Sequence, residues 1–332
     1  MRLRVKLQLM IVDAHLDLAW NALDHGRDLL LPLEELRARA GTSTPMVTLP
    51  ALREGGVGLV FATLYVDPKS YPTPSEAHRA ALAQLELYLA WEDSGWVRIV
   101  RNSDDLEAQR QSFAQDGVVG IVILMEGAEP VQKPEEVSTW ARRGVRILGP
   151  AWHRTRYAGG TGEPGGLTQL GYELVAAMSE AGIALDTAHL AEEAFFQALE
   201  AYQGPVLASH ANARALTPTD RHLSDEMLKA LRSRDGVVGI VLANFFLLKP
   251  YDSSTGRLPL SAVRKQIDHL VAIMDPEHVG IGSDFDGGFG LEDVPLGIDC
   301  PADLVKIAQD LPDSSAQGLL GENWLRWLAS WI

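Results

Sequence analysis

Apolar runs recur along the chain, separated by stretches in which apolar residues repeat at helical spacing. Eight of these runs are candidate strands, and the run at 57–65 is rich in the β-branched and aromatic residues that favour strands. They cover residues 11–17, 57–65, 116–126, 144–149, 182–189, 205–210, 235–241 and 278–284. Near-continuous apolar runs are typical of strands that are buried on both faces of a parallel sheet. The pattern therefore predicts eight buried, parallel strands.

Between the strands, the apolar residues lie on one face of a helix. Helices are predicted over residues 74–92, 168–181, 192–201 and 260–274, and another begins at Ser224, whose side chain is a good N-terminal cap. The chain from Pro301 onward is expected to be helical, with Trp324, Trp327 and Trp331 as a packing surface. Alternating strands and helices favour an α/β fold, a (β/α)8 TIM barrel, over a doubly wound open sheet.

Several features bear on domain organisation. The letters Asp-Gly-Val-Val-Gly-Ile-Val occur at residues 116–122 and again at 235–241, which favours structurally equivalent strands of one barrel. No proline-rich or low-complexity linker divides the 332 residues, so a single domain over residues 1–332 is predicted. A glycine-rich loop is expected over 159–166. Residues 2–9 alternate polar and apolar side chains, which favours an amphipathic strand over a secretory leader.

Composition and charge narrow the function classes. The chain has 44 acidic and 29 basic residues, a formal net charge of -15, which argues against nucleic acid or an anionic membrane as a partner. No apolar run approaches the roughly 20 residues of a membrane span. Cys300 is the only cysteine, so an intrachain disulfide and a cysteine-rich zinc site are excluded. A cytoplasmic location is expected.

Metal-binding residue types stand at the ends of most predicted strands. These residues are His15, Asp17, Glu126, His153, His189, His210 and Asp284. Functional groups of a TIM barrel lie at the carboxyl ends of its strands, so these side chains should converge. His15 and Asp17 should point the same way, because side chains alternate along a strand. The joint pattern predicts a site for more than one metal ion.

The types of ligand indicate the chemistry of that site. Histidine and carboxylate ligands suit zinc or a similar divalent ion, and one carboxylate can bridge two ions roughly 3.5–4 Å apart. Two ions lower the pKa of a trapped water from 15.7 toward about 7 and so supply hydroxide at neutral pH. Such a site is suited to hydrolysis.

With these motifs in place, the chain resembles the membrane dipeptidase (renal dipeptidase) family of zinc metallopeptidases, within the wider group of amidohydrolase barrels. The motifs follow in family order and extend over nearly the whole chain. The residues that carry the resemblance are 13–17, 125–127, 166–171, 185–189, 209–211, 221–225 and 280–287.

The resemblance implies a role for each matching position. His15 and Asp17 would hold one Zn²⁺, His189 and His210 the second, and Glu126 would bridge the two. His153 would face the substrate and stabilise the oxyanion, Arg221 would pair with the substrate's terminal carboxylate, and Asp284 would carry the proton to the leaving amine. The implied enzyme is a binuclear zinc dipeptidase in which metal-bound hydroxide attacks dipeptides, with a C-terminal D-residue left open. A homodimer is also implied.

The residues leave structural alternatives for several of these positions. Arg221 lies beside Asp220 and Asp225 in the sequence and could form a surface ion pair, and His153 could merely hydrogen-bond the glycine-rich loop. Asp186 and Asp286 could orient neighbouring ligands or cap turns. Five further histidines are taken as structural. They are His25, His78, His222, His269 and His278.

Two alternative functions stay open. The same metal site could act on a different amide, an N-acyl amino acid or a lactone, as other amidohydrolase barrels do, and Arg221 is the residue that discriminates between them. A barrel that binds metal or ligand without catalysis is the third hypothesis. The chain departs from the family's better-known members in lacking a secretion signal, paired cysteines and a lipid-anchor tail, so their membrane attachment and disulfide-linked dimer are not expected here.

Overall fold

The computed structural model describes residues 10–41, 43–252, 254 and 256–332. Eight parallel strands follow one another around a barrel, which closes because the second and third of them pair along their length. The barrel strands are β1 (Ile11–Leu16), β2 (Val57–Tyr65), β4 (Val119–Glu126), β5 (Val145–Gly149), β8 (Ala184–Asp186), β9 (Val206–Ala208), β10 (Val237–Ile240) and β11 (Val279–Ile281). Each lies within one predicted strand region, so the predicted TIM barrel is confirmed. Both copies of the seven-letter repeat lead into barrel strands, β4 and β10.

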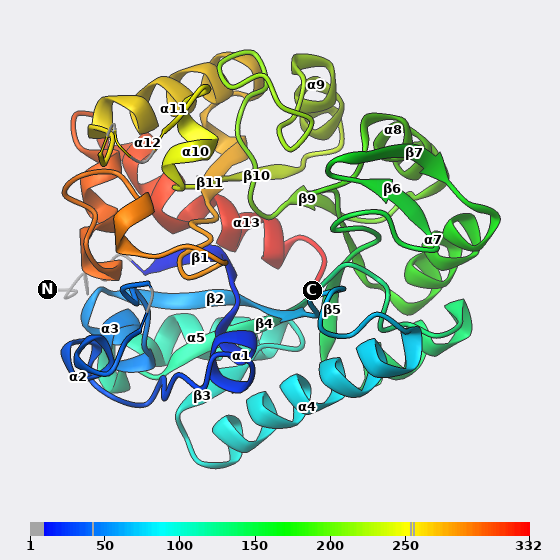
Figure 1. Cartoon of the computed structure of the whole chain (residues 1–332), viewed down its shortest axis with the longest axis horizontal. Helices are drawn as coiled ribbons and strands as arrows, with labels where there is room; N and C mark the ends of the chain where they lie inside the picture. The colour runs from blue at the N-terminus through cyan, green and yellow to red at the C-terminus, as the bar shows by residue number, and fades with distance from the viewer. Residues whose placement is uncertain (1–9, 42, 253, 255) are drawn as a thin grey trace, which may run out of the picture.

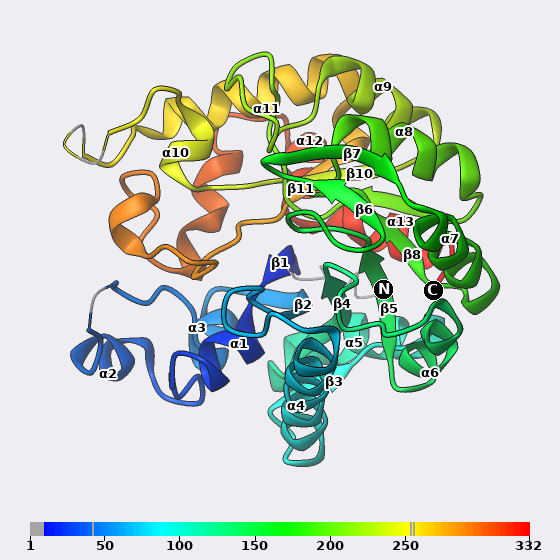
Figure 2. The same ribbon diagram turned by 45° about the vertical axis from the view of Figure 1, so that its right-hand side comes forward.

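Helices surround the barrel. Figure 2 shows α9 and α11 on one side of the strands and α4 and α5 on the opposite side. The helices are α1 (Leu18–Leu23), α2 (Leu33–Ala38), α3 (Leu49–Glu54), α4 (Pro74–Asp93), α5 (Ser103–Asp116), α6 (Val137–Arg142), α7 (Gln169–Ala181), α8 (Glu192–Ala201), α9 (Asp225–Ser233), α10 (Asn244–Leu247), α11 (Leu260–Met274), α12 (Asp313–Gln317) and α13 (Asn323–Ala329). The predicted helices correspond to α4, α7, α8, α9 and α11.

Local signals fix where several helices begin and end. The Thr73 side chain accepts a hydrogen bond from the Glu76 backbone while the Glu76 side chain accepts one from the Thr73 backbone, a capping box that starts α4. Ser224 caps α9 as expected, accepting from the backbone of Met227. Gly182, at a φ of 65°, ends α7 in the left-handed conformation that glycine adopts without a steric penalty.

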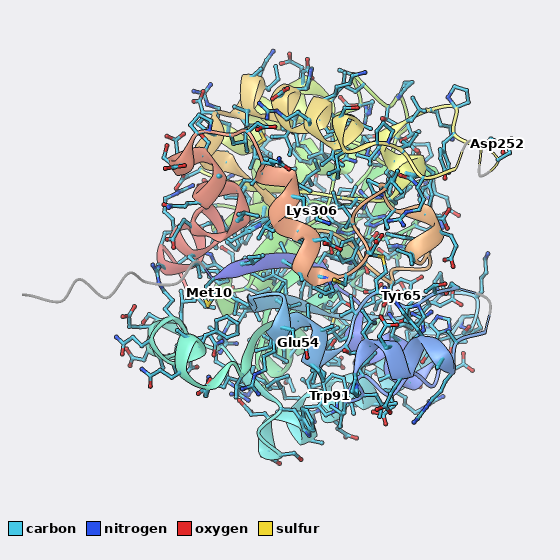
Figure 3. The ribbon with its side chains drawn as sticks, turned by 90° about the vertical axis from the view of Figure 1, so that its left-hand side faces the viewer. Met10, Glu54, Tyr65, Trp91, Asp252 and Lys306 are labelled. Atoms are coloured by element: carbon cyan, nitrogen blue, oxygen red, sulfur yellow. The ribbon has the colours of Figure 1, made fainter. Side chains whose placement is uncertain are left out.

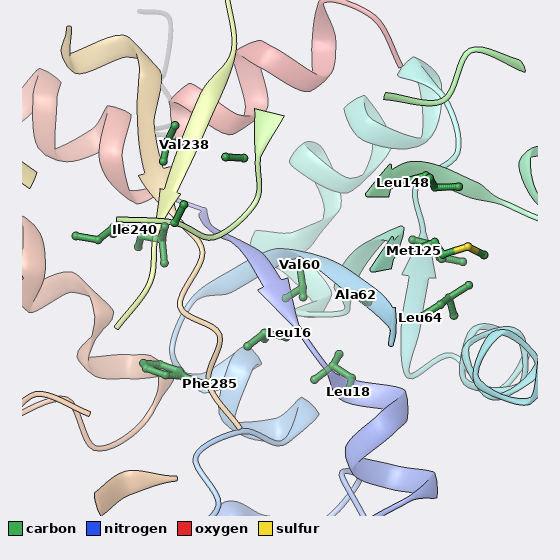
Figure 4. Close-up of a cluster of buried hydrophobic side chains, with 14 of the residues drawn as sticks. Leu16, Leu18, Val60, Ala62, Leu64, Met125, Leu148, Val238, Ile240 and Phe285 are labelled. Atoms are coloured by element: carbon green, nitrogen blue, oxygen red, sulfur yellow. The ribbon is translucent and has the colours of Figure 1, made fainter. Parts of the chain in front are cut away.

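The buried apolar residues form two layers. Val60 and Ala62 of β2, Met125 of β4 and Leu148 of β5 belong to the larger cluster, which packs between the strands and the surrounding helices (Figure 4). The residues that alternate with them fill the inside of the barrel, among them Phe61 of β2. Because side chains alternate along a strand, the barrel strands supply both layers, except β11, whose alternating residue is Gly280.

The C-terminal segment closes the amino-terminal end of the barrel. Trp324 of α13 is fully buried within the interior cluster, with its ring centroid 5.2 Å from that of Phe61. Its indole N–H donates to the carbonyl of Ile281 at 2.9 Å. A Cβ on Gly280 would lie only 2.2 Å from Trp324 Nε1, so glycine is required for this close approach. The predicted packing role of the tryptophan-rich tail is confirmed.

Some segments differ from the sequence-based predictions. The glycine-rich segment folds into an antiparallel hairpin of β6 (Ala158–Gly160) and β7 (Glu163–Leu167) packed against α8 (Figure 1). A short strand that was not predicted, β3 (Val97–Ile99), pairs with the first half of β4. The tail begins with a 3-10 helix (Pro301–Ala308) and contains a π-helical turn (Gly318–Glu322) before α13.

The predicted strand over residues 2–9 lies outside the described residues, which begin at Met10 (Figure 3). Among the residues that the structure describes, no helix is both long enough and apolar enough to cross a membrane.

Candidate metal centre

Inside the barrel, the inward-facing positions change from apolar to polar toward the carboxyl ends of the strands. Phe61 of β2 is followed by Thr63, and Leu124 of β4 by Glu126, each two residues later on the same face. Ser209 follows β9 in the same way, and its side chain is fully buried. A polar layer therefore covers the apolar interior at the end of the barrel where barrel enzymes carry their functional groups.

Six of the predicted site residues converge on this layer. They are His15, Asp17, Glu126, His189, His210 and Asp284, and each is at most 8% exposed. In two sets, the ligand atoms lie within 4.8 Å of one another. The first set is His15, Glu126 and His210, and the second is His15, Asp17 and Asp284. Buried acids and imidazoles in such numbers need compensating charge or hydrogen bonds.

Glu126 divides its two carboxylate oxygens between different imidazoles. Its Oε2 lies 3.4 Å from His15 Nε2, whereas its Oε1 lies 3.2 Å from His189 Nε2 and 3.5 Å from His210 Nε2. The same His15 Nε2 is also 3.7 Å from Asp17 Oδ1 and 4.0 Å from Asp284 Oδ1. Glu126 thus stands between two groups of ligand atoms.

The protein alone does not balance the charges and polar atoms of this cluster. Burial raises the pKa of Asp17 to about 7, and the neighbouring charge of Glu126 adds to the shift. Burial also raises the pKa of Asp284 well above its ordinary value. Burial opposes the charged form of His15, but Glu126 and Asp17 outweigh it and raise the pKa of His15 to about 10.

The ring nitrogens of the cluster also indicate that a positively charged partner is missing. Within the part of the chain that the structure describes, His15 Nε2 is buried without a hydrogen-bond partner, and the Nε2 atoms of His189 and His210 face each other at 3.0 Å. Carboxylates and imidazole nitrogens are ligands for zinc and similar divalent cations. The donor set therefore fits bound divalent cations, which would supply the missing positive charge and satisfy these nitrogens.

Hydroxyl side chains contact the candidate ligands, and the sequence analysis did not single them out. Thr63 donates a hydrogen bond to the Asp17 carboxylate. Thr161, at the tip of the β6–β7 hairpin, places its Oγ1 3.0 Å from His189 Nδ1. Ser209 contacts both His15 and His210 through their Nδ1 atoms. For Thr63 and Ser209, the alternation of inward-facing residues along a strand was the signal that could have identified them.

His153 lies at the mouth of this site. It lines a cavity of about 390 Å³ together with Glu126 and Trp152. Its Nδ1 is 2.6 Å from the carbonyl oxygen of Thr161, so Nδ1 carries a proton and donates to that oxygen. The contact with the glycine-rich segment is therefore present, and it leaves Nε2 as the nitrogen available to a ligand.

Arg221 does not form the surface ion pair that its sequence neighbours suggested. Its side chain is 5% exposed, and only Nη2 has a partner, the carbonyl of His210 at 2.8 Å. Nε and Nη1 are buried without partners among the described residues, and the guanidinium lies 5.3 Å from the centre of the Phe246 ring. The acidic neighbours bond elsewhere: Asp220 accepts from the Gly162 backbone and Asp225 contacts His269.

The remaining candidates lie outside the cluster. Asp186 accepts from the backbone N–H groups of Ala188 and Ser209, so it supports the segment that carries His210. Asp286 accepts from two backbone N–H groups at 46–47 and contacts Arg27 at 3.2 Å, away from the imidazoles. The other five histidines belong to neither group of candidate metal-binding residues.

The fold and this donor set define a metal-dependent hydrolase of the TIM-barrel class. The chain belongs to the membrane dipeptidase family (peptidase family M19), whose model matches residues 2–330. Membership of this family identifies the protein as a metal-dependent hydrolase of the metallopeptidase class.

Similar proteins agree with this membership. An uncharacterised Klebsiella pneumoniae protein from the pqqA 5′ region is 33% identical over 74% of this chain and 92% of its own length. An uncharacterised dipeptidase of Schizosaccharomyces pombe is 28% identical over 85% of this chain and 71% of its own. A Rhodobacter sphaeroides metallopeptidase, solved with a phosphinate mimic of the dipeptide L-Ala-D-Ala, superposes with a TM-score of 0.84 at 27% identity, covering 98% of this chain and 99% of the other.

Proposed function

We propose that the protein is a binuclear zinc dipeptidase. The observation that carries this proposal is the division of Glu126, with one oxygen toward His15 and the other toward His189 and His210. In this arrangement His15 and Asp17 would hold one Zn²⁺, His189 and His210 would hold the other, and Glu126 would serve both. Zinc held there would supply the Lewis acidity that activates water and polarises a carbonyl.

The proposed proton carrier is Asp284. Its carboxylate lies 4.0 Å from His15 Nε2, within the cluster of candidate ligands, and burial holds its pKa well above the ordinary value. A carboxylate in that position takes the proton of the attacking water and delivers it to the departing amine. His153 faces the substrate with Nε2, and it donates to an oxyanion when the ring is protonated, because Nδ1 already donates to Thr161.

Dipeptides fit the polar groups around the cluster. Arg221 offers two unpartnered guanidinium nitrogens to a carboxylate, and a buried charge of this kind favours a ligand of opposite charge. The phosphinate mimic bound by the Rhodobacter sphaeroides relative supports extending the substrates to dipeptides with a C-terminal D-residue.

The direct test combines metal analysis with a dipeptide panel. Purified protein should contain about two zinc ions per chain and cleave L,L and L,D dipeptides. Dialysis against a chelator should abolish hydrolysis, and added Zn²⁺ should restore it. A fully loaded protein that leaves dipeptides intact but cleaves an N-acyl amino acid or a lactone would replace the proposed substrate class.

Arg221→Ala should raise KM for dipeptides by roughly 10- to 100-fold, because a hydrogen bond to a charged group contributes about 1.5–3 kcal/mol. The change in kcat should be smaller, since the carboxylate is not one of the reacting groups. Steady-state kinetics with a dipeptide and its C-terminal amide provide the control. The amide lacks the carboxylate, so wild type and variant should handle it with similar KM. An equal KM for the free dipeptide in both proteins would remove Arg221 from carboxylate recognition.

We also propose a homodimer and a cytoplasmic location. Three large apolar side chains, Leu170, Tyr172 and Phe196, are exposed by about 40% on the packed helices α7 and α8, and such residues are candidates for a subunit interface. Light scattering that gives the mass of one chain would contradict the dimer. Fractionation of cells from the source organism would test the location.

A further inference from the structure

The hydroxyl of Ser209 lies between two imidazoles, those of His15 and His210, which the proposed function assigns to different metal positions. Ser209 Oγ is 3.3 Å from His15 Nδ1 and 2.9 Å from His210 Nδ1. The two rings are stacked, with centroids 3.6 Å apart and an interplanar angle of 28°. Ser209 itself is fully buried, so water does not compete for these contacts. No other side chain described above reaches candidate ligands of both positions through one atom.

The hydrogen-bonding capacity of a serine hydroxyl matches this position. An imidazole that binds a cation through Nε2 keeps its proton on Nδ1 and must donate it. Ser209 Oγ has two lone pairs, one for each ring, and a single hydrogen left to donate. With both metal positions filled, the two Nδ1 protons and the two lone pairs of Ser209 Oγ are matched.

Asp186 and two glycines hold Ser209 in place. Asp186 Oδ1 accepts from the backbone N–H of Ser209 at 2.9 Å and from that of Ala188 at 3.0 Å. A Cβ on Gly239 or on Gly282 would lie 2.0 or 1.9 Å from the Ser209 carbonyl oxygen. The neighbouring strands therefore approach Ser209 so closely that its backbone has little room to shift.

We infer that Ser209, supported by Asp186, is a positioning residue that couples the two metal positions by fixing the orientation and the protonated nitrogen of one imidazole in each. The inference rests on the proposed function, since it assigns His15 and His210 to different ions. Loss of the hydroxyl should weaken both ions together. Partners that orient a metal-binding histidine typically contribute 10- to 100-fold to metal affinity.

Thr161 provides a matched comparison. Its hydroxyl also contacts a ligand imidazole, at 3.0 Å from His189 Nδ1, and it lies on the separate β6–β7 hairpin. His189 belongs to one position only. Removal of the Thr161 hydroxyl should therefore weaken one ion and leave the other unchanged.

The test is a metal titration of the apoprotein that does not depend on activity. Co²⁺ binding to wild type, Ser209→Ala and Thr161→Ala is followed by visible absorption and by calorimetry, which give two stepwise dissociation constants. In Ser209→Ala both constants should rise by about 10- to 100-fold. In Thr161→Ala only one should rise. Ser209→Cys, which keeps the side-chain volume and a weak acceptor, should lie between wild type and Ser209→Ala, and it replaces the alanine variant if that variant does not fold.

The outcomes separate this inference from the proposed function. A Ser209→Ala protein that is folded by circular dichroism and loses affinity for one ion only, or for neither, would overturn the coupling role. A wild type that binds two ions but cleaves no dipeptide would contradict the proposed substrate, while the stepwise constants would still decide the role of Ser209.

Discussion

Asp284→Asn should lower kcat for dipeptides by about 10²- to 10⁴-fold, the usual contribution of a positioned acid–base group. The amide keeps the size of the side chain but cannot take up and return a proton near neutral pH. Asparagine also tolerates the left-handed backbone at this position, where φ is 60°. Since Asp284 is not one of the proposed zinc-binding residues, the metal content should stay near two ions per chain.

Steady-state kinetics and metal analysis of the same preparation check this expectation. Asp268→Asn serves as the control, because this carboxylate lies on the surface of α11 and pairs with Arg264 within the helix. The control should keep wild-type kcat. An Asp284→Asn enzyme with wild-type turnover would assign the proton transfer to another group.

Glu126→Gln should remove most of the bound metal and, with it, dipeptide hydrolysis. The substitution takes away the one negative charge that faces both groups of imidazoles, with contacts of 3.2 to 3.5 Å. Loss of a direct ligand should exceed the 10- to 100-fold loss that follows removal of an indirect partner. We therefore expect affinity for both ions to fall by more than about 100-fold, measured by chelator competition.

A neighbouring glutamate supplies the comparison. Glu129 lines the same cavity as Glu126 but contacts Arg156, at 3.4 Å, and no imidazole. Glu129→Gln should retain both ions. If Glu126→Gln also retains them with unchanged affinity, then Glu126 is not a bridging ligand and the binuclear centre must be built differently.

The fold was predictable because buried barrel strands have a distinctive apolar pattern. Each of the eight runs coincides with a barrel strand, and the polar residues that end them were visible by position alone. Small elements were harder to find. β3 has only three residues, too few for a period, and the β6–β7 hairpin was hidden because its glycines indicate a loop. Its glycines instead allow the two strands to approach closely, since a Cβ on Gly159 would meet the Gly165 backbone at 2.5 Å.

The candidate site was only partly predictable, for a different reason. His15, Glu126 and His210 were found because histidines and acids are rare in apolar runs. Thr161 and Ser209 were not, since hydroxyl residues are common and their contacts depend on how distant segments meet. The burial of Arg221 was equally hidden. Asp220, its neighbour in the sequence, bonds instead to the backbone of Gly162 in the hairpin, a tertiary contact that no local pattern encodes.

The position of Trp324 at the amino-terminal end of the barrel affects how small molecules enter and leave the site. Because Trp324 fills the interior at the amino-terminal end, the proposed reaction would release its two amino acids through the same mouth by which the dipeptide enters. With the proposed role of Arg221, accumulated free amino acid would bind this guanidinium in place of the dipeptide and slow further turnover.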